Sequence, residues 1–298
     1  MGMSFSLIVQ YLLSGVTSGS VYAVVAIGFN IIYSTTGIIN FAQGEFVMLG
    51  GMIAISLAPL LPLPGAIAAA VALTAVVGLL AQVAFIRRVR HATVLQLVTI
   101  TIGLSILLRE AALHVWDEKV RSLPYFTGSA ISSVEICGAR VSPQVFWVLG
   151  VCGAAVALLH AFFNHTLTGR AMRACAADPL AATLCGINQR NLVTLSFAIS
   201  AAIGALAGCV VSPIAQTHYE CGTPLAIKGF TVAILGGLGN SAGAVAAGLL
   251  LGVIEAFSIS VLPMAYKDII AIGILLVMLT WRPTGLFVRR ELGTLREF

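Results

Sequence analysis

Long apolar stretches constrain the fold of this 298-residue chain more than any motif does. They lie at about residues 7–33, 41–60, 64–85, 94–113, 143–163, 193–216, 226–262 and 266–281. A helix needs roughly 20 apolar residues to cross the hydrocarbon core of a bilayer, so these stretches supply about eight to ten membrane segments. Only 9% of the residues are charged, whereas soluble domains carry about 25%. The sequence therefore predicts an all-α, polytopic transmembrane helical bundle that forms one domain over residues 1–298.

The stretch 226–262 is too long for one crossing, and we expect it to form a broken helix pair. The interruption consists of Gly236, Gly237, Gly239 and Asn240. Lipid cannot satisfy the backbone groups that a break releases, so we expect this break to face the bundle interior. The stretch 7–33 is also long, and it either crosses once or is broken near residues 15–19.

Glycines four residues apart predict close contacts between helices, because they let two backbones approach. Such pairs occur at Gly15/Gly19, Gly204/Gly208, Gly239/Gly243 and Gly248/Gly252. Together they favour a compact bundle.

Arginines gather in three connecting regions, at residues 87–90, 170–190 and 282–290. The positive-inside rule places all three in the cytoplasm, which makes residues 114–142 an external loop and residues 164–192 a cytoplasmic loop. The formal net charge of +5 therefore indicates orientation in a membrane, and no nucleic-acid partner is expected.

We predict no catalytic residue, no metal site and no cofactor bound by this chain. The six cysteines form no CxxC pair and no Cys/His spacing suited to zinc. A P-loop needs a lysine followed by Ser or Thr, but Lys119, Lys228 and Lys267 are followed by Val, Gly and Asp. We therefore expect that the chain cannot bind ATP through a P-loop.

The cytoplasmic loop contains the sequence GRAMRACAADPLAATLCGINQR at residues 169–190, which predicts two helices separated by a break. Asp178 suits a helix N-cap, Pro179 the first helical position, and Gly186 the left-handed residue after a helix end. The second helix would have about seven residues, too few to be stable alone in water. It therefore needs a surface to dock on, either a cytoplasmic partner or the chain's own bundle.

This loop resembles the coupling loop of ABC importer permeases, in which two alanines, three variable residues and a glycine follow one another. Ala181, Ala182 and Gly186 match that pattern, whereas Leu180 stands where the motif has a glutamate.

Two further stretches resemble the permeases of branched-chain amino-acid ABC importers. They are GSVYAVVAIGFNIIYSTTGIINFAQGEFVMLGG at residues 19–51 and GFTVAILGGLGNSAGAVAAGLLLGVIEA at residues 229–256. The resemblance covers nearly the whole chain in order.

The resemblance implies a permease subunit in the bacterial inner membrane that translocates branched-chain amino acids or related small solutes. Its implied partners are ATP-binding cassette ATPase subunits that use the ATP, a second permease subunit that is a homologue or a copy, and an external solute-binding protein. The residues implied to form the ATPase-coupling loop are Arg170, Arg173, Asp178, Pro179, Ala181, Ala182 and Gly186.

Polar residues in or beside the apolar stretches are candidates for the translocation pathway, since ionisable groups in a membrane usually face the bundle interior. They are Asn40, Gln43, Glu45, Asn240 and Glu255. Each also has a structural interpretation. Asn40 and Gln43 fit a capping-box variant, Glu45 fits a first helical turn, Asn240 fits the capping of freed backbone, and Glu255 fits a buried hydrogen bond.

Two other classes of function compete with the permease interpretation. A secondary transporter or channel that works alone would need ion-coupling carboxylates in the core and no docking loop. A serine hydrolase is suggested by Gly239, Ser241 and Gly243, but that motif needs a strand before the serine, and the sequence predicts a helix there.

Overall fold

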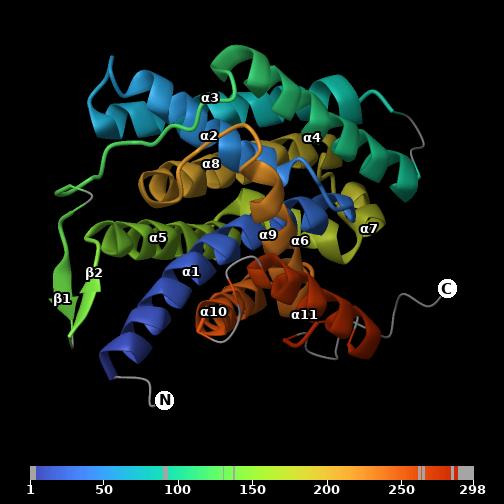
Figure 1. Cartoon of the computed structure of the whole chain (residues 1–298). Coiled ribbons are helices and arrows are strands. Elements are labelled where there is room, and N and C mark those ends of the chain that lie inside the picture. The colour runs from blue at the N-terminus through green and yellow to red at the C-terminus, as the bar shows by residue number, and fades with distance from the viewer. Residues whose placement is uncertain are drawn as a thin grey trace.

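The computed structural model of the protein describes residues 5–89, 93–129, 131–136, 138–260, 263, 266–282 and 285–287 (Figure 1). The helices are α1 (Phe5–Thr36), α2 (Gln43–Leu57), α3 (Leu63–Ala81) with a π-helical continuation (Gln82–Ile86), α4 (Val94–Trp116), α5 (Gln144–His165), α6 (Leu167–Ala177), α7 (Pro179–Leu184), α8 (Gln189–Ala215), α9 (Gly222–Gly236), α10 (Ser241–Ser258) and α11 (Lys267–Trp281). Strands β1 (Val134–Ile136) and β2 (Ala139–Val141) form an antiparallel hairpin.

Six of the described helices are long and apolar enough to cross a membrane, and α2, α9 and α11 are shorter apolar helices. The prediction of an all-α, polytopic helical bundle is therefore confirmed. The β1–β2 hairpin and the N-terminus of α1 lie at one end of the bundle, here called the hairpin end (Figure 1). The short helices α6 and α7 lie at the opposite end, here called the α7 end (Figure 1).

Helix α1 lies in the middle of the bundle and is continuous over 32 residues, so it has no break near residues 15–19. Its residues from Val21 to Ile32 are all buried. It packs along α10 and also contacts α5, α8 and α9. Because the stretch from Val21 to Ile32 is buried on all sides, it lacks an amphipathic stripe and is almost uniformly apolar in sequence.

Glycine allows α1 and α10 to touch through their backbones. A Cβ atom added at Gly19 would lie 2.5 Å from the Gly248 carbonyl oxygen, and one added at Gly15 would lie 2.7 Å from Cα of Val253. Gly208 brings α8 against the Val47 carbonyl of α2 in the same way. The close packing predicted from three of the four glycine pairs is confirmed, whereas Gly239 of the remaining pair forms a turn with φ of +87°.

Residues 237–240 separate α9 from α10, so the predicted broken pair is confirmed. The Asn30 side chain of α1 satisfies backbone groups at the break, accepting from the Gly239 N–H at 3.1 Å and donating to the Asn240 carbonyl at 3.3 Å. The expected interior position is correct for Gly237, which is buried, and wrong for Gly239, which is exposed. The reason is that α9 begins midway along the bundle and has already reached the α7 end at Gly236.

Helices α2 and α9 both begin in the middle of the bundle. Gln43, the first residue of α2, contacts Ser200 near the middle of α8, and Glu45 contacts Ser105 near the middle of α4. Gly222, the first residue of α9, lies directly against Gly44. Helix α2 continues to the hairpin end, where Ser56 meets Trp116 of α4, and α9 runs to the α7 end.

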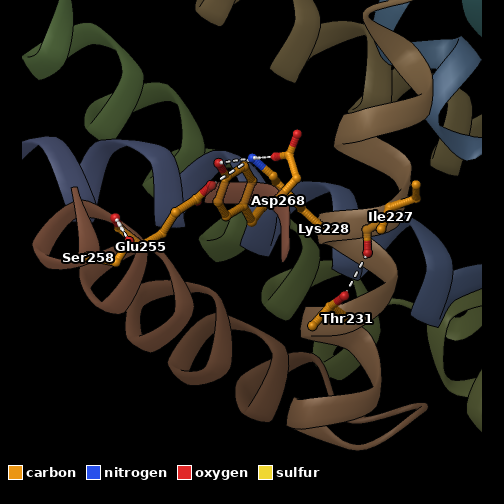
Figure 2. A network of polar contacts seen from close by, with 7 residues as sticks. Ile227, Lys228, Thr231, Glu255, Ser258 and Asp268 are labelled. Carbon is orange, nitrogen blue, oxygen red and sulfur yellow. Dashed lines mark hydrogen bonds and ion pairs between the residues drawn. The ribbon is translucent and has the colours of Figure 1, made fainter. Parts of the chain in front are cut away.

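Four helices are held together by charged and polar side chains around Lys228 of α9 (Figure 2). The Lys228 Nζ atom lies 2.6 Å from Oε1 of Glu255 in α10 and 2.8 Å from Oδ1 of Asp268 in α11. It also donates to the Tyr22 hydroxyl of α1 at 3.4 Å. The Lys228 and Glu255 side chains are only 10% and 1% exposed, so the buried Glu255 charge depends on Lys228 for compensation.

We predict that Gly208→Ala destabilises the protein by about 1–3 kcal/mol, because the added methyl group overlaps the α2 backbone. Gly150→Ala on α5 is the matched control, since a Cβ there meets nothing within 4 Å. Thermal unfolding in detergent measures both. Equal midpoints for the two variants would contradict the close contact between α2 and α8.

We also predict that Lys228→Met destabilises the protein by about 3–5 kcal/mol, because the buried Glu255 carboxylate then loses the cation that compensates its charge. The double variant Lys228→Met/Glu255→Gln removes both buried charges and should recover most of the loss. The same thermal unfolding assay measures the recovery. A single variant as stable as the wild type would mean that the network does not stabilise the bundle.

Candidate functional site

A cavity of about 230 Å³ lies where α2 and α9 begin, and α4 forms its third side. We call it the central groove. It is lined by Phe41, Glu45, Ile102, Ser105, Ile106, Arg109, Thr223, Ala226, Ile227 and Phe230. Ile102, Ile106 and Ile227 are exposed on its rim, so the groove opens to the surface of the chain. Most of the lining is apolar, and its polar members are Glu45, Ser105, Arg109 and Thr223.

Glu45 provides the buried polar group of the groove and is only 1% exposed. Its Oε1 atom accepts hydrogen bonds from the Ser105 hydroxyl at 2.9 Å and the Thr223 hydroxyl at 3.4 Å. Its Oε2 atom is buried and has no hydrogen-bond partner in the described structure. Glu45 lies in the first turn of α2, as predicted, and beside the first turn of α9. The positive ends of two helix dipoles therefore offset part of the cost of burying this carboxylate.

Arg109 supplies the second charge of the groove. Its Nη1 atom donates to the Thr223 hydroxyl at 3.5 Å, and the side chain is half-buried on α4. Among the described ion pairs, none joins Arg109 to Glu45. Thr223 thus lies between a cation and an anion that do not neutralise each other directly.

Asn40 and Gln43 are fully buried next to the groove without lining it. The Asn40 Oδ1 atom accepts from the Ala42 N–H at 3.2 Å. The Gln43 side chain donates to the Ser200 carbonyl at 3.2 Å, and Ser200 in turn donates to the Gly28 carbonyl of α1 at 2.8 Å. The expected capping box is not formed, because Gln43 turns toward α8 and leaves Ala42 as the N-cap without a side-chain bond.

Asn240 and Glu255 also lie outside the central groove. Asn240 caps α10 by accepting from the Gly243 N–H at 3.1 Å, and its side-chain amide donates to the Phe287 carbonyl at 3.1 Å. Glu255 belongs to the Lys228 network (Figure 2). Ser241 begins α10 and follows a helix and a turn, so the strand that a nucleophile elbow needs is not present there.

The sequence prediction missed Lys228, Arg109, Ser105 and Thr223 as site residues. A signal was present for Lys228, because an isolated lysine in an apolar stretch needs a buried acidic partner, and Glu255 lies on the following helix. Ser105 and Thr223 carry no such signal, since their role depends on two helices starting at the same depth. Among the described residues, no group of three or more His, Cys, Asp or Glu side chains could hold a metal ion.

The second candidate region is the α6–α7 loop at the α7 end of the bundle. The Asp178 Oδ1 atom accepts from the N–H groups of Leu180 and Ala181 at 2.9 and 3.0 Å, so Asp178 caps α7 as the sequence predicts. Pro179 occupies the first turn of α7. Gly186 has φ of +83° after the end of α7, which is the left-handed conformation expected there.

Arginine side chains attach α6 to the end of α5. Arg170 donates to the Asn164 carbonyl at 3.2 Å, and Arg173 donates to Asn164 Oδ1 at 2.9 Å. Ala182 is only 4% exposed and packs with Met172 of α6 and Leu192 of α8. The two short helices therefore share one apolar cluster with the start of α8.

The opposite face of α7 is exposed and apolar. Leu180 and Leu184 are 74% and 82% exposed, respectively. Together with Asp178, Thr183 and Gln189 they border an open hollow of about 540 Å³. We call this the α7 surface. Both leucines of this six-residue helix therefore face outward.

Comparison with known proteins identifies the family. Residues 11–279 match the family model described as the permease component of branched-chain amino acid transport systems. The chain is 35% identical to the high-affinity branched-chain amino acid transport system permease protein BraD of Pseudomonas aeruginosa, covering 95% of this chain and 96% of that protein. It is 34% identical to the corresponding LivH permease protein of Escherichia coli K12, covering 98% of this chain and 99% of that protein.

A more distant match is the ribose import permease protein RbsC of Escherichia coli K12, with 26% identity over 78% of this chain and 73% of that protein. Together with the six long apolar helices, these matches identify a multi-pass membrane protein. The chain belongs to the family of permease components of branched-chain amino acid transport systems.

Proposed function

We propose that this chain is the membrane subunit of an ATP-driven importer in the bacterial inner membrane and that it translocates branched-chain amino acids or related small solutes. The observation that carries the proposal is the family match over residues 11–279, with relatives whose names specify branched-chain amino acid transport. Membership in a family of permease components favours a subunit of a larger importer over a transporter that works alone.

In this proposal, the α7 end lies in the cytoplasm and the hairpin end lies outside. Arg170, Arg173 and Arg190 belong to or follow the α6–α7 unit, and Arg87 and Arg88 follow α3. Basic residues in short loops favour the cytoplasmic side. The solute-binding protein would then deliver its solute at the hairpin end.

ATPase subunits would dock on the α7 surface. Leu180 and Leu184 offer apolar contacts, and Asp178 and Gly186 fix the ends of the helix that carries them. Because Ala182 packs on α6 and α8, a push on α7 reaches α8 directly. Ser200 of α8 binds Gln43, so the same motion reaches the start of α2 at the central groove. Differential docking in two states of the ATPase would therefore move the groove.

A second permease subunit, a homologue or a copy, would cover the central groove. The groove opens to the surface of the chain, and Glu45 at its base is costly to bury without a partner in lipid. Two permease subunits facing each other would enclose the polar groups around Glu45 and leave a translocation pathway between them.

Reconstitution in proteoliposomes tests the proposed function. The tagged chain is purified gently with its co-purifying subunits, and uptake of radiolabelled leucine, isoleucine and valine is measured with its binding protein and internal ATP. We expect uptake that depends on ATP and on the binding protein. Uptake by the purified chain alone, driven by an ion gradient, would instead support a self-sufficient transporter.

We predict that Leu184→Asp lowers the amount of ATPase recovered with the chain by about fivefold or more, because a buried leucine contact at an interface centre is worth roughly 1–3 kcal/mol. Ile131→Asp is the control, since Ile131 is 92% exposed near the hairpin. Pull-down in mild detergent measures both variants. Equal recovery of the ATPase with both would exclude the α7 surface as its docking site.

A further inference from the structure

We propose that the central groove binds the amino acid during translocation, with Glu45 contacting its ammonium group and Arg109 contacting its carboxylate. This inference rests on the proposed function and deepens it, because it assigns recognition of the zwitterion to two side chains. It also assigns recognition of the aliphatic side chain to the apolar wall of the groove.

Glu45 lines the groove and has one carboxylate oxygen without a hydrogen-bond donor, which a cationic ligand would satisfy. Its Oε1 atom is bound by Ser105 and Thr223, whereas its Oε2 atom is buried without a partner. A structural role in joining α2, α4 and α9 explains the first oxygen and leaves the second unexplained. A buried carboxylate oxygen without a donor is costly, and a primary ammonium group supplies three donors and a compensating charge.

Arg109 lies at a suitable place for the other end of the ligand. The Thr223 hydroxyl donates to Glu45 at 3.4 Å and accepts from Arg109 at 3.5 Å, so one hydroxyl separates the two charges. An α-amino acid carries its ammonium and carboxylate groups on one carbon, which matches charges held this close without direct pairing. Arginine has five N–H donors in a planar fork that suits a carboxylate.

The remaining wall of the groove suits a branched aliphatic side chain. Phe41, Ile102, Ile106 and Phe230 line it, and the Phe41 and Phe230 rings pack with centroids 5.7 Å apart. Small-ligand sites commonly combine such an apolar lining with a few convergent polar groups. The groove therefore presents the three contacts that distinguish a branched-chain amino acid from a sugar or an inorganic ion.

A protection assay tests binding independently of the binding protein. Ile106→Cys places a thiol on the exposed wall of the groove, in a parent chain in which Cys137, Cys185 and Cys221 are serine. The assembled complex in nanodiscs is treated with N-ethylmaleimide in the presence of leucine, 4-methylpentanoate or 3-methylbutylamine. The last two compounds lack the ammonium and the carboxylate group, respectively.

We expect leucine to slow the modification of the thiol and the two analogues to have little effect at the same concentration. Glu45→Gln should weaken protection by leucine about tenfold or more, because a charge-assisted hydrogen bond is lost. Arg109→Gln should do the same, and Arg109→Lys should restore part of the protection. If Glu45→Gln prevents assembly of the complex, the two Arg109 variants decide the question.

Import measurements separate this inference from the proposed function. Glu45→Gln should lower leucine uptake by the assembled complex relative to the wild type. Glu110→Gln is the control, because it makes the same substitution at an exposed position of α4 next to Arg109 and should leave uptake unchanged. The inference about the groove would be overturned, and the proposed function would stand, if the wild type imported leucine but leucine did not protect the thiol. The same conclusion would follow if protection survived both Glu45→Gln and Arg109→Gln. Failure of the wild-type complex to import any branched-chain amino acid would overturn the proposed function.

Discussion

Backbone groups inside a bilayer must find partners within the protein, and this requirement governs where α2 and α9 begin. The chain approaching each helix crosses part of the bundle without helical hydrogen bonds. Asn40 and Thr101 contact the N–H groups of Ala42 and Phe41, and Gln43 is held by Ser200. Gly44 and Gly222 let the two helix starts touch. Without these local contacts, α2 and α9 could not expose their N-termini to a common groove in the middle of the protein.

The chain treats its buried charges in two different ways. Lys228 is bound by Glu255 and Asp268, so its charge is neutralised between α9, α10 and α11. Glu45 is held at only one oxygen, and Arg109 nearby is separated from it by Thr223. The first arrangement fixes α9 against its neighbours. The second arrangement leaves one oxygen of Glu45 without a donor beside the start of α9, where we propose that the amino acid binds.

The sequence predicts those features that depend on neighbouring residues in the chain. Asp178, Pro179 and Gly186 define α7 because capping and left-handed conformations are local, and the glycines near residue 237 mark the break for the same reason. The depth at which α2 and α9 begin could not be predicted, since apolar composition continues through both starting points. The Glu45 environment could not be predicted either, because Ser105 and Thr223 reach it from helices that are distant in sequence.

The contacts that α8 makes with α7 and with α2 suggest how a displacement at the α7 surface could reach the central groove. The α6–α7 unit is packed on the start of α8 through Ala182 and Leu192, and the middle of α8 is bonded to Gln43 through Ser200. Gly208 holds the later part of α8 against α2 without intervening side chains. Close-packed interiors deform little, so a helix with tight contacts at three levels would pass on a displacement of its first turn. If ATPase subunits dock on the α7 surface as proposed, α8 would connect that surface to the central groove, whereas Lys228 joins α9 to α10 and α11.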